Sequence, residues 1–166
     1  MDARCAPVFT EVSNLARFLE EQGSGRVVLA NGCFDPLHVG HVRFLRGAAA
    51  HGDLVVVALN NDESTHKLKG EGRPVVGETD RAAVLASMEM VHAVLLFGDD
   101  TLAPILEALR PDVHANGTDF TVETVPEFDT SRRLGIETVV VGDPKSHASS
   151  RVLERIKSDD DRPGDE

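Results

Sequence analysis

The sequence lacks long apolar runs and contains few cysteines. No stretch of roughly 18 or more consecutive apolar residues occurs, which excludes an ordinary membrane-spanning helix. The first five residues, Met1 to Cys5, have none of the apolar character of a signal peptide. The two cysteines, Cys5 and Cys33, are too few for a disulfide framework, so we expect a cytoplasmic protein.

Cationic residues are also scarce. The chain has 17 lysines and arginines against 28 aspartates and glutamates, for a net charge of −11. This balance argues against nucleic acid or an anionic membrane as the main partner. Part of the charge is local, because residues 158–166 contain five acidic residues and one arginine beside a proline and a glycine. That composition predicts an acidic disordered tail.

Neither an internal repeat nor a domain linker interrupts the 166 residues, which fit one domain with a single core. Apolar runs alternate with helical patterns, and this order predicts a doubly wound α/β domain with a parallel five-stranded sheet over 25–157. A helical extension is expected at 1–24. The expected strands cover 27–30, 54–59, 91–97, 112–115 and 136–141, and the expected helices cover 10–22, 39–50, 79–90, 101–110, 122–134 and 149–157.

The segment that follows the first expected strand, Asn31 to His41, concentrates groups that suit a phosphate. Ligands bind at the carboxyl ends of parallel strands, and a helix beginning there offers backbone amides and a favourable dipole to an anion. His38 and His41 lie three residues apart on one face of this helix, and Gly40 lets a phosphate approach the backbone. Two imidazoles aimed at one point suit the α-phosphate of a triphosphate, where charge accumulates during in-line attack.

Other interpretations of this segment are weaker. The two histidines, Cys33 and Asp35 are residue types that can bind a metal ion. However, the four-residue spacing and the glutamate of the zinc helix motif are missing, so we expect no metal ligands in the protein. A phosphate loop of the form G-x-x-x-x-G-K-[ST] is absent too. Taken alone, His38 fits a helix cap as well as a catalytic group.

The run from Gly32 to His41, Gly-Cys-Phe-Asp-Pro-Leu-His-Val-Gly-His, resembles the signature of the cytidylyltransferase-like nucleotidyltransferases. The resemblance implies a Rossmann-like fold, a homo-oligomer such as a dimer, and an enzyme that joins a nucleoside triphosphate to a phosphorylated small molecule with release of pyrophosphate. Within the family, the chain is most similar to the adenylyltransferases that make ADP-heptose from heptose 1-phosphate. The similar segments are Asn60 to Ser64, Lys67 to Gly70, Arg73 to Val75, Asp80 to Arg81 and Asp99 to Thr101.

The resemblance implies roles for individual residues. His38, His41 and Lys69 would be catalytic, with Lys69, alone or together with Lys67, neutralising phosphates from a flexible loop. Taken by itself, Lys67 fits a solvated surface position. Arg81 would serve the triphosphate or the acceptor; a surface ion pair with Glu78 is the alternative. The implied nucleotide site consists of Gly32, Cys33, Phe34, Asp35, Gly40, Arg81, Asn116, Gly117, Asp119, Ser149 and Ser150.

The chain departs from the family pattern at two places. Asn116 stands where the heptose enzymes have a lysine, and Ala148 replaces the first residue of their Ser-Thr-Thr motif, leaving the hydroxyls of Ser149 and Ser150. These serines suit both a helix cap and a phosphate contact. Lys145 or His147 would compensate for an arginine that the glycerol-phosphate enzymes carry nearby.

Several functions remain open at this point. The favoured one transfers AMP from ATP, with Mg²⁺ accompanying the triphosphate, to a sugar 1-phosphate such as heptose 1-phosphate. The alternative uses CTP and glycerol 3-phosphate or another phosphoalcohol or phosphonate, because backbone contacts near Gly117 and Gly142 decide the base. A nucleotide-binding module without turnover is a third possibility, supported by Asn116 and Ala148. A flavodoxin-like cofactor domain leaves the His-x-Gly-His run unexplained.

Overall fold

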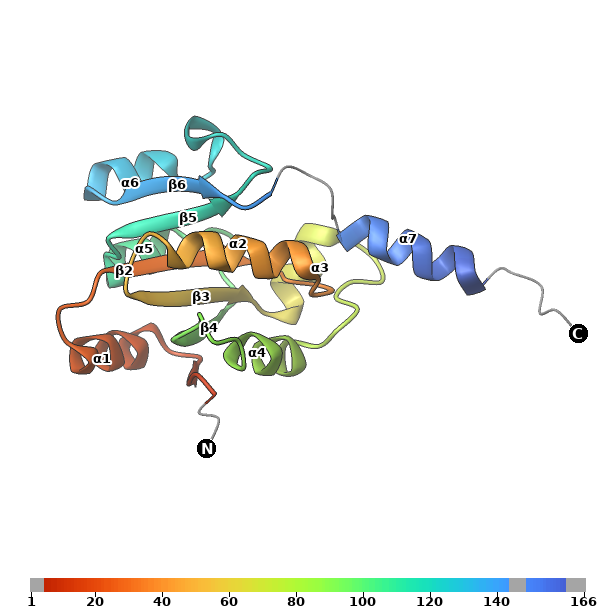
Figure 1. Ribbon diagram of the computed structural model, residues 1–166, viewed down its shortest axis with the longest axis horizontal. Helices are drawn as coiled ribbons and strands as arrows, with labels where there is room; N and C mark the ends of the chain where they lie inside the picture. The colour runs from red at the N-terminus through yellow and green to blue at the C-terminus, as the bar shows by residue number, and fades with distance from the viewer. Residues whose placement is uncertain (1–4, 144–148, 161–166) are drawn as a thin grey trace, which may run out of the picture.

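A parallel sheet of six strands forms the centre of the computed structural model, which describes residues 5–143 and 149–160 (Figure 1). The prediction of a doubly wound parallel sheet is confirmed, but the expected number of five strands is corrected to six. The additional strand contains two residues and pairs with β4 at the edge, too short to show a pattern in sequence. In the order β1-β4-β3-β2-β5-β6, the strands are β1 (Val8–Phe9), β4 (Ala93–Phe97), β3 (Leu54–Asn60), β2 (Val27–Gly32), β5 (Val113–Gly117) and β6 (Glu137–Val141).

Helices connect successive strands and cover both faces of the sheet (Figure 1). The last one continues to Asp160, three residues beyond its expected end at 157, and 161–166 lie outside the described residues. Among the described residues, no helix is both long and apolar enough to cross a membrane. The helices are α1 (Val12–Gln22), α2 (Val39–Ala49), α3 (Asp62–Lys69), α4 (Glu78–Ala86), α5 (Ala103–Leu109), α6 (Phe128–Leu134) and α7 (Ser149–Asp160), with a 3₁₀ turn at Val122–Thr124.

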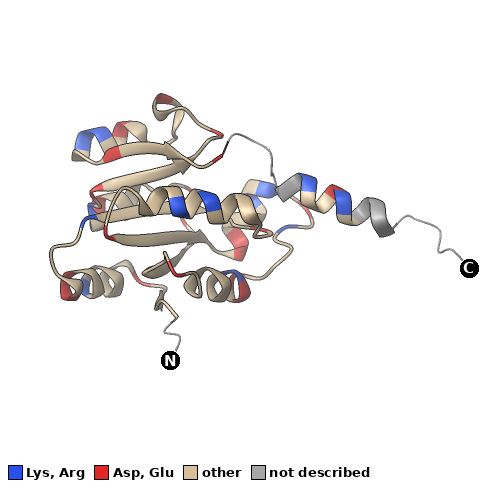
Figure 2. Ribbon diagram, viewed as in Figure 1, with Lys and Arg blue, Asp and Glu red and all other residues tan. Residues whose placement is uncertain are grey.

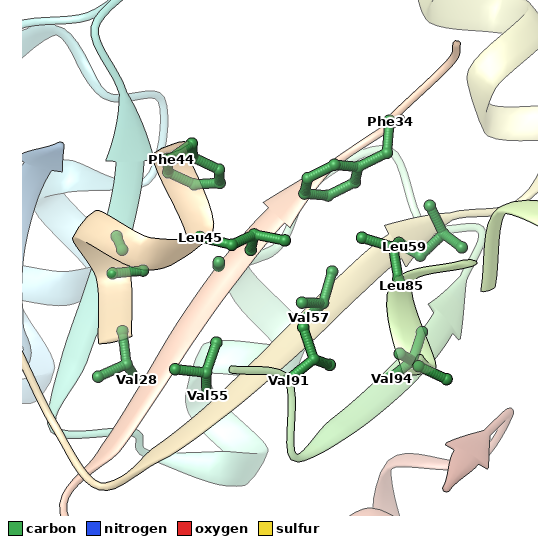
Figure 3. Packing of buried hydrophobic residues seen from close by; sticks show 14 of the residues in the cluster. Val28, Phe34, Phe44, Leu45, Val55, Val57, Leu59, Leu85, Val91 and Val94 are labelled. Atoms are coloured by element: carbon green, nitrogen blue, oxygen red, sulfur yellow. The ribbon is translucent and has the colours of Figure 1, made fainter. Parts of the chain in front are cut away.

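Successive side chains of each strand point to opposite faces of the sheet, so the core consists of two layers. In β3, Val55 and Val57 face a cluster that includes residues of α2 and α4 (Figure 3), whereas Val56 faces a cluster that includes residues of α1 and α5. Leu15 of α1 is fully buried in the second cluster, so the helix expected as an N-terminal extension packs into the core.

The α3 segment differs from its prediction as a flexible loop. Its apolar content is too low for a hydrophobic stripe, and the helix is stabilised at its ends instead. The side chain of Asn61 accepts a hydrogen bond from the Ser64 amide at 2.8 Å, with Asp62 in the first turn and Lys69 in the last. Capping and this placement of charges favour a helix without an apolar face.

The strand order reverses between β2 and β5. From β2 the chain proceeds through β3 to β4 on one side and then crosses to β5 and β6 on the other. Such a switch point leaves a crevice at the carboxyl ends of the two strands, because the connections leave them in opposite directions. The segment from Cys33 to His38 follows β2 at this crevice, and Asn116 lies near the end of β5. The fold therefore directs attention to the start of α2.

Candidate active site

The two histidines of the His-x-Gly-His run cap α2 reciprocally. His38 is the N-cap residue, and its Nδ1 accepts a hydrogen bond from the Gly40 amide at 3.1 Å. The Nδ1 of His41 accepts one from the His38 amide at 3.2 Å, and the ring centroids lie 4.0 Å apart. Because Nδ1 is the acceptor in both rings, each neutral ring carries its proton on Nε2. The cap interpretation and the catalytic interpretation of His38 are thus compatible.

The environment keeps His41 uncharged. Burial, the neighbouring His38 and the charge of Lys69 together lower the pKa of His41 from 6.5 to about 4. The charge of Lys69 therefore acts on the His41 imidazole, and its role in neutralising phosphates stays a prediction. At neutral pH, His41 is therefore a neutral hydrogen-bond donor through Nε2.

We expect the His41 imidazole to titrate with a midpoint near pH 4 in an NMR pH titration of the folded protein, identified by the resonance that His41→Ala removes. The same resonance in urea should titrate near 6.5, the ordinary value. Since the unfolded chain then binds the proton first, this histidine makes the protein lose stability as the pH falls from 6.5 towards 4. A midpoint above 6 in the folded state would contradict the neutral donor.

Phe34 packs against His41, the second histidine of the pair. Its ring is buried and packs against His41 at a centroid distance of 5.1 Å and against Phe44 at 6.3 Å. The backbone of Phe34 adopts a positive φ of 50°, an uncommon conformation for a bulky residue. A Cβ atom on Gly32 would lie 3.2 Å from the Phe34 ring, closer than an ordinary van der Waals contact, so the glycine leaves room for this ring. The Phe34 ring therefore packs between His41 and Phe44.

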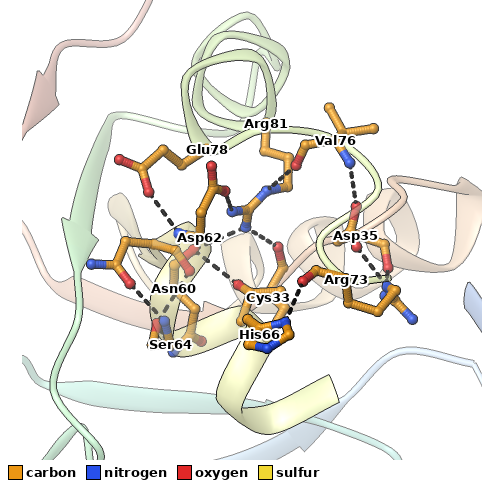
Figure 4. A network of polar contacts seen from close by, with 12 residues as sticks. Cys33, Asp35, Asn60, Asp62, Ser64, His66, Arg73, Val76, Glu78 and Arg81 are labelled. Carbon is orange, nitrogen blue, oxygen red and sulfur yellow. Dashed lines mark hydrogen bonds and ion pairs between the residues drawn. The ribbon is translucent and has the colours of Figure 1, made fainter. Parts of the chain in front are cut away.

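Asp35 connects this segment to the chain before α4. Its buried carboxylate accepts hydrogen bonds from Arg73 Nε at 2.7 Å, the Val75 amide at 2.8 Å and the Val76 amide at 2.9 Å (Figure 4). Burial alone would raise the pKa of Asp35, but the hydrogen bonds and the charge of Arg73 outweigh it, so the pKa lies below its usual value. Both carboxylate oxygens are engaged within the protein, which favours a positioning role over a nucleotide contact.

Arg81 lies inside the protein, with 1% of its surface exposed. The guanidinium donates to the carbonyl oxygens of Cys33, Asn60 and Val76 at 2.6, 2.9 and 2.8 Å, and to the carboxylate of Asp62 at 2.6 Å (Figure 4). It thereby joins the histidine segment, the end of β3, the chain before α4 and the start of α3.

The alternative of a surface ion pair between Arg81 and Glu78 is wrong. Glu78 accepts a hydrogen bond from the Asp62 amide at 2.6 Å, and the ion pair of Arg81 is made with the Asp62 carboxylate. A direct contact of Arg81 with triphosphate, as the resemblance implies, fits this buried position less well than a positioning role.

The remaining predicted residues lie at the ends of β5 and α7. Asn116 is buried, Gly117 ends β5, and Asp119 lies in the exposed loop beyond it. Ser149 and Ser150 begin α7, but their side chains, like Lys145, His147 and Ala148, lie outside the described part of the chain.

No role for Arg73 or His114 was predicted from the sequence. A buried carboxylate at Asp35 requires a cation, but nothing in the sequence shows which one. His114 is fully buried in β5, where Nε2 lies 3.0 Å from Asn31 Oδ1 and Nδ1 lies 3.4 Å from Ser131 Oγ. Burial lowers the pKa of His114 to about 4, so it is neutral as well. A single histidine in a strand pattern gave no signal of this network.

Although the chain is acidic overall, cationic residues recur on α2 and α7 on the face shown in Figure 2. Arg43 of α2 pairs with Asp143 at 2.6 Å, linking α2 to the segment after β6. Within 5–143 and 149–160, no cluster of three or more histidine, cysteine, aspartate or glutamate residues is arranged to hold a metal ion.

Comparison with known proteins matches residues 29–158 to the family described as cytidylyltransferase-like. Curated relatives named bifunctional protein HldE are similar: that of Citrifermentans bemidjiense is 40% identical over 84% of this chain and 28% of its own length, and that of Methylobacillus flagellatus is 41% identical over 88% and 30%. The chain thus spans under a third of these relatives.

A solved structure, titled the lipopolysaccharide core biosynthesis protein from Thermoplasma volcanium, aligns with a TM-score of 0.63 and 21% identity over 74% of this chain and all of its own. At this identity it supports the fold alone. The family match covers most of the sequence, including the histidine pair and the switch point between β2 and β5. The chain belongs to the cytidylyltransferase-like family of nucleotidyltransferases.

Proposed function

We propose that the chain transfers AMP from ATP to a sugar 1-phosphate, with heptose 1-phosphate as the favoured acceptor, and releases pyrophosphate. The observation that carries the proposal is the capped histidine pair, whose Nε2 protons are held at the N-terminus of α2 beside the switch point. Such a helix end already favours a phosphate through its amides and dipole.

In the proposed reaction, a phosphate oxygen of the acceptor attacks the α-phosphorus of ATP in line, and the bond to the β-phosphate oxygen breaks as pyrophosphate departs. His38 and His41 donate hydrogen bonds from Nε2 to the α-phosphate oxygens, where negative charge develops. Lys69, whose charge lowers the pKa of His41, would add a positive charge near the phosphates. No covalent intermediate with the protein is required.

Mg²⁺ would bind with the triphosphate. Asp35 is a poor ligand for it, because both carboxylate oxygens already accept hydrogen bonds within the protein. The triphosphate itself is the oxygen-rich group that Mg²⁺ prefers in such sites. When bound, the ion would neutralise charge on the departing pyrophosphate.

The acceptor is proposed from two observations. The Lys67–Gly70 and Arg73–Val75 segments resemble the heptose adenylyltransferases, and the curated relatives at about 40% identity share the name HldE. CTP with glycerol 3-phosphate stays the alternative pairing. A homo-oligomer and a cytoplasmic location stay predictions from the sequence.

The test is pyrophosphate release with Mg²⁺, in which ATP and CTP are each combined with heptose 1-phosphate and with glycerol 3-phosphate. Release confined to ATP with heptose 1-phosphate is the expected result. Release with another pair would retain the nucleotidyltransferase chemistry and replace the substrate. Nucleotide binding by calorimetry without release in any mixture would favour the module without turnover.

Lys69→Ala should raise the KM for ATP and lower kcat, because the positive charge that acts on His41 is removed. We expect a combined loss in kcat/KM of about 10-fold or more, on the scale of a charged hydrogen bond. Lys67→Ala is the matched control on the same helix, since Lys67 is exposed and pairs with Glu63 at 3.0 Å. Equal kinetics for the two variants would show that Lys69 is a solvated surface residue without a catalytic role.

A further inference from the structure

We propose that the side-chain amide of Asn116 determines substrate specificity by donating a hydrogen bond from Nδ2 to an oxygen atom of a bound substrate. The inference rests on the proposed function and concerns the same crevice. It identifies a neutral donor at the end of β5, on the opposite side of the switch point from β3.

The first observation is a buried donor without a partner. Asn116 has 5% of its surface exposed, and its Nδ2 is the only buried side-chain nitrogen or oxygen in the described residues that has no hydrogen-bond partner. Leaving such a group unpaired destabilises a protein, so most buried polar groups are bonded. An unpaired amide that persists at a ligand-binding edge is best explained by a partner that arrives with the substrate.

The second observation is how the surrounding polar groups are used. His114 precedes Asn116 by two residues in β5, so the two side chains leave the same face of the sheet. His114 engages Asn31 Oδ1 at 3.0 Å and Ser131 Oγ at 3.4 Å. Asn31 Oδ1, the neighbouring acceptor in β2, is thus already bonded to His114, and Asn116 Nδ2 has no partner in this network.

The third observation is the position of Asn116 along β5, relative to the neighbouring strands β2 and β6. Ala115 pairs with Ala30 in β2, and Asn116 pairs with Val140 in β6, so Asn116 lies one residue further towards the carboxyl ends of the central strands. The segments that follow β5 and β6 are joined by a hydrogen bond from Thr118 Oγ1 to the Asp143 carbonyl at 2.7 Å. Because Nδ2 is shielded from solvent, contact with a substrate requires a small displacement of the groups that cover it.

An amide donor recognises an acceptor oxygen without adding charge. Phosphate oxygens and sugar hydroxyls are both such acceptors, and either ATP or the sugar 1-phosphate can supply them. The side chain would discriminate against a substrate that lacks the oxygen, because its amide would stay unpaired in the complex.

Asn116→Leu tests the inference through two measurements that should move in opposite directions. Leucine has a similar size and no donor, so Tm of the unliganded protein should stay equal or rise. ATP and heptose 1-phosphate are titrated separately by calorimetry in the presence of Mg²⁺. For one of the two substrates, the Kd should rise about 10-fold. Weakening for ATP assigns the oxygen to the nucleotide, and weakening for the sugar phosphate assigns it to the acceptor.

Asn116→Asp is the second variant, because it keeps the shape and replaces the donor by an acceptor. It should weaken binding of the same substrate at least as much as leucine does. A fall of several degrees in Tm for Asn116→Leu, unchanged Kd values for both substrates, or no binding of either to the native protein would overturn the inference. Failure of the proposed function is separate: it would appear as absent pyrophosphate release by the native enzyme while ATP still binds.

Discussion

His41→Ala is expected to lower kcat by about 10²–10³-fold while the protein stays folded, the range typical for removal of one preorganised donor from a developing oxyanion. The variant removes the neutral Nε2 donor that the lowered pKa and the α2 cap maintain. It also removes the acceptor of the His38 amide, which should reduce the free energy of unfolding by about 1 kcal/mol. Steady-state kinetics of pyrophosphate release and urea unfolding measure the two effects.

The matched control is His51→Ala, beyond the opposite end of α2 from the histidine pair. Its kcat should remain near that of the native enzyme. If His41→Ala retains a near-native rate, the transition-state role of this histidine is wrong. If instead circular dichroism shows that the variant is unfolded, the loss of activity is due to unfolding. His41→Asn, which keeps a side-chain acceptor for the cap, is then the variant to test.

Arg81→Met is expected to lower the free energy of unfolding by about 3–5 kcal/mol, the usual loss when one member of a buried ionic network is removed. Methionine fills much of the space but leaves the carbonyl oxygens of Cys33, Asn60 and Val76 without their donor. For a chain of this length, Tm should fall by roughly 10 °C. Chemical denaturation monitored by circular dichroism gives the free energy directly.

Arg46→Met on the exposed side of α2 is the matched control, and its stability should change by no more than about 0.5 kcal/mol. The two proposed roles of Arg81 give different results. A positioning role couples loss of stability with loss of turnover, because the histidine segment loses its attachment at Cys33. Unchanged stability with weakened ATP binding would show instead that Arg81 contacts the triphosphate, as the family resemblance implies.

Strands and the histidine segment were predictable because their patterns are local. The apolar runs of β2 and β3 and the His-x-Gly-His run are each visible within about ten residues. The α3 helix was missed because its stability comes from the Asn61 cap and charged ends, which an apolar periodicity does not reveal.

The partners of buried charges were not predictable for a different reason. Asp35 and Arg73 are 38 residues apart in sequence, and Arg81 reaches Cys33 across 48 residues. Only the fold brings these groups together. Sequence similarity marked Asp35 and Arg81 as residues of the site but did not distinguish a residue that touches the ligand from one that holds the chain in place.

The reciprocal cap has a consequence for redesign of this scaffold. The Nδ1 atoms of both rings accept backbone hydrogen bonds from the first turn of α2: that of His38 from the Gly40 amide, and that of His41 from the His38 amide. Replacing one side chain alone removes one of these two bonds and the ring against which the remaining imidazole packs. An attempt to graft new chemistry onto the start of α2 therefore has to exchange both positions together, with a pair that restores the two bonds to the helix.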